Sequence, residues 1–418
     1  MGNDGGDYPD KTMTNKQAAI NVIKRLQRSG FEALLAGGCV RDMLLRRRAK
    51  DHDVATNAQP MDVIRLFKRT LKVGAKFGVV IVLIEKQQVE VATFRTESGY
   101  ADGRHPGSVR FSGAAEDAGR RDFTINGMFY DPLGKRVIDY VNGQADLKNR
   151  VIRTIGAPTE RFGEDYLRML RAVRFSAQLG FAIDPATWSA IRDNAKKIAK
   201  ISGERIAIEL EGILACPNRA EGSSMLFESG LVDAIFPGLT AEHAKSAVEV
   251  LRQLRKKVDF ALALACLFAG CRTEFALQSC EALKLSRNQT KHIRFLLDNG
   301  GKLLDEQMSL AGLKKILAEP YFGDLYEFQR AIQKAKRDRK GLATLIALRK
   351  RIKALGDVEL KPKPLLDGHD LMRLGAVPGP TVGQLAEEMY IAQLEGTLQT
   401  PAQAEHWARR WLQKHANH

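Results

Sequence analysis

The sequence has few cysteines and no apolar run of membrane-spanning length, so neither a disulfide framework nor a membrane span is expected. Its five cysteines are scattered, with no Cys-x-x-Cys pair and no zinc spacing, which predicts reduced thiols in a cytoplasmic protein. No Ser/His/Asp or Cys/His arrangement indicates covalent catalysis. Residues 1–13 are polar and lack a signal-peptide core, so we expect a disordered tail there.

The size and charge of the chain limit the remaining possibilities. At 418 residues it is too long for one ordinary core, and two to four domains are expected. The formal net charge of +16 favours a polyanionic partner, and combined with a triphosphate site it would favour nucleic acid over membrane. Nothing in the sequence indicates an obligate protein partner.

Residues 34–58 contain the densest group of chemically informative side chains. Leu34–Ala36 form an apolar run that ends at Gly37 and Gly38. Glycines let the backbone approach a bulky ligand, and the helix predicted to follow directs its free N–H groups to the same spot. Arg41 adds a guanidinium that matches phosphate oxygens. Together these residues predict a triphosphate site.

Two carboxylates, Asp51 and Asp53, follow a short basic loop and begin ten residues after Arg41. On an extended strand alternate side chains share a face, so both carboxylates would lie together while His52 points away. Adjacent carboxylates repel each other unless a cation lies between them, and Mg²⁺ binds carboxylates together with substrate phosphates. The pair therefore predicts a magnesium site, although Asp-x-Asp alone also fits two solvated acids at a strand end.

A third carboxylate lies in a predicted antiparallel hairpin formed by Val79–Glu85 and Val89–Arg95. Glu90 stands among apolar residues of the second strand, an unusual place for a carboxylate unless that face forms a site. We therefore predict that Glu90 joins Asp51 and Asp53 as a catalytic group. The alternative is an edge strand that exposes Glu90 to water.

Residues 96–110 are polar and glycine-rich without periodicity, which predicts a long functional loop. The basic Arg104, His105 and Arg110 favour a mobile lid near the phosphates. Further along, two adjacent arginines precede an apolar segment, and Arg121 is the one predicted to hold the triphosphate or ribose. The alternative is that both arginines are surface charges.

The periodicity becomes helical at Glu160 and stays so nearly to the end of the chain. Asp165 and Arg168 are three residues apart, and Arg171 and Arg174 follow at the same interval, which predicts one charged ridge on one helix. A fixed carboxylate and guanidinium can present hydrogen-bond acceptors and donors to the edge of a base. An ordinary salt bridge on a solvated helix is the alternative.

The later helices are also charged. A helix capped by Ser202 carries Glu204 and Arg205, which we expect to be structural salt-bridge partners. From Ala241 onward, successive amphipathic helices have Lys/Arg-rich faces. Several such faces in a chain with a nucleotide site favour a groove that follows an RNA backbone.

These motifs together resemble the bacterial-type (class II) tRNA nucleotidyltransferase and poly(A) polymerase family. The matching motifs, in the family's order, are Gly37-Gly38-x-x-Arg41-Asp42, Asp51-x-Asp53, Arg120-Arg121-Asp122-Phe123-Thr124-Ile125-Asn126 and Glu164-Asp165-x-x-Arg168 with Leu170-Arg171-Ala172-x-Arg174-Phe175. The match covers residues 30–215, and beyond it the chain resembles the family only in being helical and basic.

The resemblance implies an α+β fold, with an N-terminal nucleotidyltransferase head of the polymerase-beta type that contains a small mixed sheet. An all-α neck, body and tail would follow it. We expect the catalytic head at residues 14–157, the neck with its nucleotide-recognition helix at 158–238, and an RNA-binding body and tail at 239–418.

The resemblance also implies a role for each matching residue. Asp51 and Asp53 would ligate Mg²⁺ in a two-metal reaction, with Glu90 beside them. The implied nucleotide-binding residues are Gly37, Gly38, Arg41, Arg121 and Asp122 at the triphosphate, Asp165 and Arg168 at the base of ATP or CTP, and Arg171 and Arg174 in support.

The implied activity is template-independent addition of C and A nucleotides from CTP and ATP to the 3′ end of tRNA. Terminal A addition alone, CC addition alone or poly(A) synthesis would use the same chemistry. A non-catalytic RNA-binding protein on this fold would be expected to lose an aspartate of the pair or the triphosphate arginine. A small-molecule nucleotidyltransferase would need neither the Glu-Asp-x-x-Arg motif nor the basic helices.

Overall fold

The computed structural model describes residues 13–72, 77–98 and 108–415. The chain forms two compact units, Met1–Ala241 and Glu242–His418. The tail expected at residues 1–13 lies almost wholly outside the described residues, and so do Arg104 and His105 of the expected lid. Across the described ranges, no helix combines the length and the apolar character that crossing a membrane requires.

The first unit is built on a mixed seven-stranded sheet with the strand order β3-β4-β5-β2-β1-β8-β9. Its strands are β1 (Ala33–Ala36), β2 (Asp53–Thr56), β3 (Thr70–Leu71), β4 (Val79–Ile84), β5 (Gln87–Thr93), β8 (Phe129–Asp131) and β9 (Arg136–Ile138). Only β2 and β5 run parallel, whereas the other neighbouring pairs are antiparallel. The mixed sheet and the β4–β5 hairpin confirm the predicted fold of the head.

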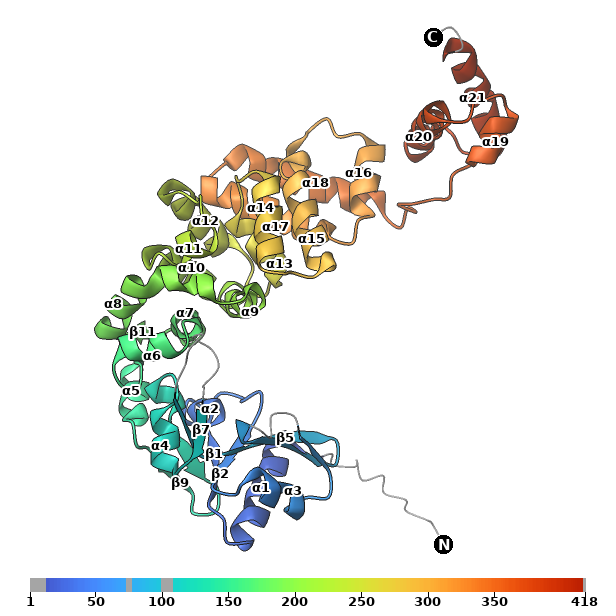
Figure 1. Ribbon diagram of the computed structural model, residues 1–418. Coiled ribbons are helices and arrows are strands. Elements are labelled where there is room, and N and C mark those ends of the chain that lie inside the picture. Colours follow the sequence, from blue (N-terminus) through green and yellow to red (C-terminus); the bar gives the residue numbers. More distant parts are fainter. Residues whose placement is uncertain (1–12, 73–76, 99–107, 416–418) are drawn as a thin grey trace, which may run out of the picture. The chain divides into compact units, whose positions relative to one another are not determined.

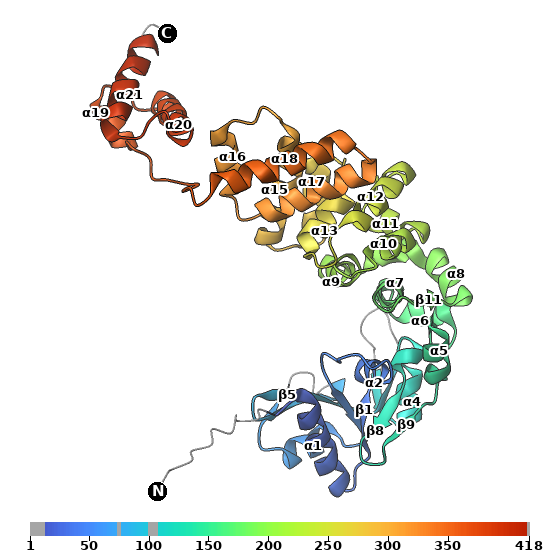
Figure 2. The same ribbon diagram turned by 180° about the vertical axis from the view of Figure 1, so that it is seen from behind.

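Helices cover both faces of this sheet. They are α1 (Asn15–Arg28), α2 (Gly38–Leu44), α3 (Pro60–Leu66), α4 (Ala114–Gly119), the 3₁₀ helix η2 (Thr124–Asn126) and α5 (Gly143–Asn149). α1 begins at the capping box of Thr14 and Gln17 and packs against β1, β2 and β5. Ala118 of α4 packs with Leu34 and Ala36, and Figures 1 and 2 show the sheet between α1 and α4. Because both faces are covered, every residue of β1 is buried.

The register of the sheet gathers the predicted site residues at one end. Ala36, the last residue before the glycine turn, pairs with Asp53. The parallel strands align Val54 with Val91, so Asp53 and Glu90, each one residue earlier, are neighbours. Since β5 is paired with both β2 and β4, Glu90 does not lie on an edge strand, but its side chain is exposed to water as that alternative expected.

The loop expected at residues 96–110 contains an antiparallel hairpin instead. β6 (Arg95–Ser98) pairs with β7 (Ser108–Phe111) as a separate two-stranded sheet, with Arg110 on β7. Each strand has only four residues and no clear apolar alternation, which is why its composition resembles that of a loop.

The rest of the first unit is largely helical. Its remaining helices are α6 (Pro158–Glu164), α7 (Leu167–Leu179), α8 (Pro185–Asn194), the 3₁₀ helix η3 (Ala195–Lys200), α9 (Gly203–Leu214), α10 (Arg219–Glu228) and α11 (Leu231–Ile235). β10 (Val151–Ile152), near the end of the predicted head, pairs in parallel with β11 (Ala182–Ile183), which interrupts the half for which only helices are predicted. α7 packs against α9 and α10 and buries Leu170 and Val173.

The second unit is helical throughout its described residues. Its helices are α12 (Ala241–Gln253), which starts at the unit boundary, α13 (Phe260–Leu267), α14 (Thr273–Ala282), α15 (Arg287–Asp298), η4 (Lys302–Leu304), α16 (Leu310–Leu317), α17 (Phe322–Lys336), α18 (Arg339–Leu355), α19 (Gly368–Arg373), α20 (Pro380–Leu394) and α21 (Pro401–His415). All of α13 is buried, and it packs against α15 and α17. A separate apolar cluster around Leu371, Met389 and Trp411 joins α19, α20 and α21.

Candidate active site

The glycine turn between β1 and α2 forms one wall of a cavity in the first unit. Gly37 has a φ of +73°, and its N–H donates to the carbonyl of Met128 at 3.1 Å. A Cβ on Gly37 would lie 2.9 Å from Nη1 of Arg121, so a side chain would displace that guanidinium. Because α2 has only seven residues and aligns few peptide dipoles, the guanidinium groups are better suited than the helix N-terminus to bind phosphate here.

Arg121 and Arg120 are both held by Asp117 of α4, which is 1% exposed. Oδ2 of Asp117 accepts a hydrogen bond from Nη2 of Arg121 at 3.0 Å, and Oδ1 accepts one from Nε of Arg120 at 2.8 Å. The guanidinium of Arg121 also lies over Phe129, 5.1 Å from the ring centroid. The sequence analysis assigned Asp117 no role, although an acid three and four residues before two arginines has the spacing of helical ion pairs.

Arg41 is fixed on the other side of the turn. Its Nε and Nη2 lie 2.9 and 2.8 Å from Oδ1 of Asp42, and its Nη1 donates to Oδ1 of Asn126 at 2.8 Å. Nδ2 of Asn126 donates in turn to Oδ1 of Asp122 at 3.1 Å. One amide therefore connects the arginine beside the glycines to the carboxylate beneath the cavity, a role that the motif alone does not reveal.

Asp122 forms a two-point ion pair with Arg171 of α7. Nε and Nη2 of Arg171 lie 2.8 and 2.6 Å from Oδ2 of Asp122. Burial raises the pKa of Asp122, but the charge and hydrogen bonds of Arg171 and the bond from Asn126 outweigh it, so this pKa lies below its usual value. Both carboxylate oxygens are engaged, so Asp122 positions its neighbours, and its direct contact with nucleotide stays a prediction.

The carboxylates of Asp51, Asp53 and Glu90 interact electrostatically where β2 begins, next to the glycine turn. The strand starts at Asp53, so the expectation that Asp51 lies on it is wrong: β1 turns away after Ala36 and leaves no partner for Asp51. The pKa of Asp53 is nonetheless raised to about 6, first by desolvation and then by the negative charges of Glu90 and Asp51. Arg121 opposes this shift. All three carboxylates are exposed.

This arrangement fits a divalent cation. Mutual repulsion makes Asp53 reluctant to ionise, which is the electrostatic condition that a bound cation relieves. Exposed carboxylate oxygens are hard ligands of the kind that Mg²⁺ and similar ions accept alongside water and phosphate. Asp51 and Asp53 are the residues that would hold the cation, with Glu90 beside them.

The single helix predicted to carry the charged ridge is broken at Asp165. α6 ends at Glu164, Asp165 has an extended backbone (φ −152°, ψ 106°), and α7 begins at Leu167. Oδ1 of Asp165 accepts the N–H of Leu167 at 3.0 Å. A short aspartate side chain that binds the backbone two residues ahead favours a turn over a continuous helix, which explains the break.

Asp165 and Arg168 are consequently held by different partners. Oδ2 of Asp165 accepts a hydrogen bond from Nη2 of Arg205 on α9 at 2.6 Å, so Arg205 forms a salt bridge as expected, although it also lines the cavity described below. Arg168 is 9% exposed, pairs with Glu164 and donates to the carbonyl of Arg161 at 3.0 Å. The alternative of a simple Asp165–Arg168 salt bridge is therefore wrong.

Three guanidinium groups surround the ring of Phe175. The guanidinium carbons of Arg41, Arg171 and Arg174 lie 5.1, 5.2 and 4.6 Å from its centroid. Arg174 is also 3.0 Å from Glu209 of α9, and desolvation lowers the pKa of Arg174 while it raises the pKa of Glu209. In the sequence Phe175 is only the last residue of a motif and is given no role, yet in the structure three arginines converge on its ring.

These residues enclose a cavity of about 440 Å³. The predicted site residues that line it are Gly37, Gly38, Arg41, Asp53, Arg121, Asp122, Asp165, Arg168 and Arg171. Its other lining residues, which the sequence analysis did not assign to the site, are Arg120, Asn126, Leu167, Phe175 and Arg205. Of the remaining predictions, Asp51 and Glu90 raise the pKa of Asp53 without lining the cavity, and Arg174 lies over the ring of Phe175. So many guanidinium groups beside carboxylates suit a polyphosphate ligand with its cation.

A further group of possible metal ligands lies in the second unit. Oδ2 of Asp259 is 3.5 Å from Nδ1 of His292, and Oδ2 of Asp324 is 3.4 Å from Nε2 of the same ring. Tyr321 stacks on this ring with the centroids 4.1 Å apart. The two imidazole nitrogens face different carboxylates, so the cluster ties α13, α15 and α17 together when His292 is protonated.

Comparison with known proteins agrees with this geometry. Residues 33–153 match the family described as the poly A polymerase head domain, and residues 180–254 match the family described as the probable RNA and SrmB-binding site of polymerase A. The fold and the site thus define a nucleotidyltransferase with a polymerase head and an RNA-binding region.

The relatives narrow this class further. The CCA-adding enzyme of Streptococcus gordonii is 34% identical over 394 residues, which cover 93% of this chain and 95% of that protein. The CCA-adding enzyme of Geobacillus kaustophilus is 48% identical over 227 residues, 54% of this chain and 56% of that protein. The chain belongs to the CCA-adding enzyme family, whose members are metal-dependent nucleotidyltransferases.

Solved structures show the same fold. The crystal structure of the Bacillus stearothermophilus CCA-adding enzyme in complex with CTP aligns with a TM-score of 0.79 at 30% identity, covering 97% of this chain and 99% of that one. The Thermotoga maritima CCA-adding enzyme complexed with tRNA aligns with a TM-score of 0.67 at 20% identity, covering 96% and 97%. At that identity the second likeness concerns the fold alone.

Proposed function

We propose that this chain adds C and A nucleotides from CTP and ATP to the 3′ end of tRNA, without a nucleic-acid template. The observation that carries the proposal is the single cavity in which guanidinium groups, a glycine turn and the exposed Asp53 come together. A relative crystallised with CTP at 30% identity and a CCA-adding enzyme that is 34% identical over 93% of this chain support the choice of substrates.

In this proposal the triphosphate lies against the glycine turn. Gly37 and Gly38 leave room for the phosphates, and Arg121 beside Gly37 and Arg41 beside Gly38 provide charged donors. Because Asp42 and Asp117 already fix these two guanidinium groups, little side-chain entropy is lost when the phosphates bind.

Asp51 and Asp53 would hold Mg²⁺, with Glu90 as the third carboxylate. When bound, the metal ions lower the pKa of the terminal hydroxyl and neutralise the charge of the departing pyrophosphate. The chain's own contribution is to bring these carboxylates close together beside the triphosphate cavity and to orient the acceptor hydroxyl and the α-phosphate in line. No side chain is required as a covalent nucleophile.

Asp165 and Arg168 would select the base. Arg205 and Glu164 hold their side chains before any nucleotide arrives. A carboxylate and a guanidinium in fixed positions can distinguish cytosine and adenine from the other bases through the hydrogen-bonding edge. Arg171 and Arg174, stacked on Phe175, would keep α7 in register with the triphosphate site.

The proposed division of labour follows the chain. Residues 14–157 would perform the chemistry, residues 158–238 would read the base, and residues 239–418 would hold the RNA backbone. We place this activity in the cytoplasm, and we regard residues 1–13 as a tail outside the catalytic head.

The decisive experiment supplies the purified chain with three RNAs: a tRNA transcript ending before CCA, one ending after CC, and a generic RNA. Each is incubated with labelled CTP or ATP, and the products are sized. We expect C and then A on the first RNA, a single A on the second and little product on the third. Labelled CTP entering none of them would refute CCA addition, and long A ladders on the generic RNA would indicate a poly(A) polymerase instead.

A further inference from the structure

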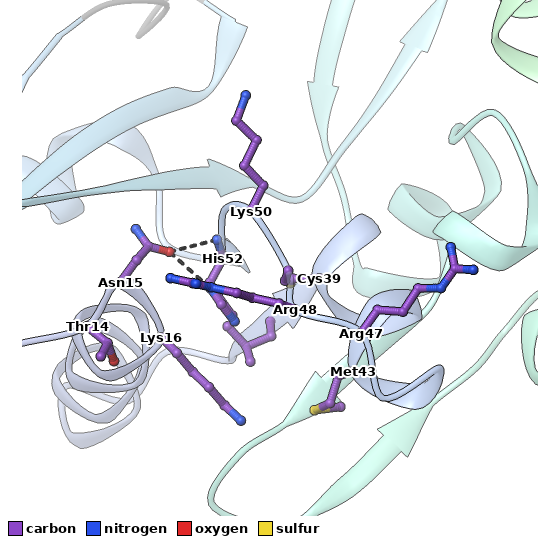
Figure 3. A pocket seen from close by; sticks show the side chains of 11 residues that line it. Thr14, Asn15, Lys16, Cys39, Met43, Arg47, Arg48, Lys50 and His52 are labelled. Atoms are coloured by element: carbon purple, nitrogen blue, oxygen red, sulfur yellow. Dashed lines mark hydrogen bonds between the residues drawn. The ribbon is translucent and has the colours of Figure 1, made fainter. Parts of the chain in front are cut away.

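A second cavity of the first unit, about 500 Å³, lies beside the metal-binding aspartates and has no role in the site described above. It is formed by the start of α1, by β1 and α2, and by the loop that precedes Asp51 (Figure 3). Its lining residues are Thr14, Asn15, Lys16, Leu35, Cys39, Met43, Arg47, Arg48, Ala49, Lys50 and His52. The lining contains four cationic side chains and no carboxylate.

Hydrogen bonds of Asn15 connect the segments that form this cavity. Oδ1 of Asn15 meets both the backbone N–H and Nδ1 of His52, at 2.9 and 3.0 Å, and Nδ2 of Asn15 donates to the carbonyl of Gln88 at 2.9 Å. One amide therefore joins α1, β5 and the segment between the two aspartates. Leu35 and the buried Cys39 provide an apolar floor.

The cations differ in their freedom to bind a ligand. Figure 3 shows Arg48 extending from the loop toward Asn15 and His52, whereas Arg47 and Lys50 point outward. Arg47 also donates to the carbonyl of Gln178 at 3.3 Å. In the part of the chain that the structure describes, no carboxylate pairs with Arg48, which leaves its guanidinium available to an anion from outside.

The position of the cavity indicates which anion this is. In nucleotidyl transfer the attacking and leaving oxygens lie roughly in line across the reacting phosphorus. Gly38 and Arg41 of α2 line the triphosphate cavity, whereas Cys39 and Met43 of the same helix line this one, so the two cavities lie on different faces of α2. His52, between the two aspartates, also faces the second cavity. An acceptor strand that attacks from the side away from pyrophosphate would therefore enter past this cavity.

We propose that this cavity binds the phosphodiester backbone of the acceptor RNA just upstream of its 3′ hydroxyl, with Lys16 and Arg48 as the phosphate ligands. The proposal rests on the function proposed above and adds a site for the acceptor strand. Arg48 lies three residues before Asp51, on the order of 10 Å of extended chain, and a stacked strand advances about 3.4 Å per nucleotide. The phosphates concerned are thus the last three before the reacting hydroxyl.

The test compares Lys16→Gln and Arg48→Gln with two charge-matched controls. Lys24→Gln removes an exposed lysine from the same helix, and Arg46→Gln removes an exposed arginine from the same loop, and neither lines the cavity. We expect both cavity variants to raise the KM for a tRNA transcript that lacks CCA by about 3- to 10-fold, with the KM for CTP unchanged. Each should also lower the slope of log affinity against log salt by about 0.7, the contribution of one single-strand phosphate contact.

A sharper readout uses ligated transcripts in which one of the last three phosphates is replaced by a neutral methylphosphonate. The modification should weaken binding to the unmodified protein and have little further effect on Arg48→Gln, because the two partners of one contact are non-additive. Equal effects in the cavity and control variants would refute the proposal. A rise in the KM for CTP alone would mean that the cavity holds a free triphosphate, which also refutes it. RNA binding is measured by filter retention without nucleotide, so these results are readable even if the chain incorporates nothing and the proposed function fails.

Discussion

Arg171 of α7 and Asp122, which follows α4, form a two-point contact in which Nη2 and Nε of the guanidinium lie 2.6 and 2.8 Å from the same carboxylate oxygen. The pair joins α7, which carries Arg168, to the turn after α4 that carries Arg121. The other oxygen of Asp122 binds Asn126, which binds Arg41. The residues proposed to bind the triphosphate and those proposed to select the base are therefore linked through Asp122.

The first prediction concerns Asp122→Asn. The substitution leaves Arg171 without its close partner, and we expect the free energy of unfolding to fall by about 2 kcal/mol because a mostly buried charge loses its counter-ion. Incorporation of CTP and ATP should fall about 10-fold or more, since both halves of the site lose alignment. Urea unfolding and steady-state incorporation measure the two effects.

The control for this prediction is Asp193→Asn, which removes an exposed carboxylate from α8 and should leave both quantities within error. The pH dependence adds a check. Because the pKa of Asp122 in the folded chain lies below its unfolded value, its stabilisation is present above pH about 4 and is lost as the pH falls through the folded pKa. The difference in the free energy of unfolding between the unmodified chain and Asp122→Asn should disappear at low pH. A difference that does not change with pH would contradict the ion-pair account.

The second prediction separates backbone strain from the site itself. Gly37→Ala and Gly30→Ala both place a Cβ on a residue with positive φ, +73° and +85°. Only at Gly37 does the Cβ approach Arg121, at 2.9 Å, because nothing lies within 4 Å at Gly30. Both variants should lose about 1 kcal/mol of stability. Only Gly37→Ala should lose incorporation, by about 100-fold, and an equal loss in both would mean that the turn does not bind phosphate.

How much of this site the sequence predicts depends on how far apart along the chain the interacting residues lie. Gly37, Arg41, Asp53 and Arg121 are readable because each belongs to a short motif whose spacing carries the chemistry. Arg205 was expected only as a structural residue, since its partner Asp165 is 40 residues away and only the packing of α7 on α9 brings them together.

The errors have local causes that pattern reading underestimates. The helical periodicity predicts one continuous helix through Asp165, but the side chain binds the backbone of Leu167, and one helix ends before the next begins. Asp51 satisfies the alternation of a strand, yet β1 ends at Ala36 and offers it no partner. Phe175 has the spacing of a core residue, and only the fold shows three arginines on its ring.

The third prediction concerns pH and metal. The folded pKa of Asp53 is about 6, above its unfolded value, so its contribution to stability is present at low pH and is lost as the pH rises through 6. In metal-free buffer at pH 7, Asp53→Asn should therefore be slightly more stable than the unmodified chain, by less than about 1 kcal/mol because the exposed carboxylate is screened. At pH 4 the two should be equal.

The carboxylate of Asp53 should also control how the incorporation rate falls at acid pH. Since protons and Mg²⁺ compete for one carboxylate, incorporation should rise with pH through a midpoint near 6 at low Mg²⁺, and the midpoint should move to lower pH as Mg²⁺ increases. Asp53→Asn should abolish incorporation while RNA binding persists. A pH midpoint of incorporation that does not change with Mg²⁺ concentration would show that another group controls the loss of activity at acid pH.

The last prediction tests base selection through a residue that need not touch the base. Arg205→Gln releases Oδ2 of Asp165 while leaving the triphosphate arginines in place, so the preference for CTP and ATP over UTP and GTP should fall about 10-fold with a smaller loss of overall rate. Arg168→Ala should blur the choice between CTP and ATP in the same way, whereas Arg192→Ala, an exposed arginine of α8, should not.

The relation between Arg205 and Asp165 decides how these results are interpreted. If Arg205 acts by positioning Asp165, then Arg205→Gln combined with Asp165→Asn should be no less selective than Asp165→Asn alone, because the second change has nothing left to disturb. Additive losses would mean that Arg205 meets the nucleotide directly from its place in the cavity wall. If every variant incorporated all four nucleotides equally more slowly, this part of the cavity would not select the base. The assignment of the triphosphate site would still rest on Arg41 and Arg121.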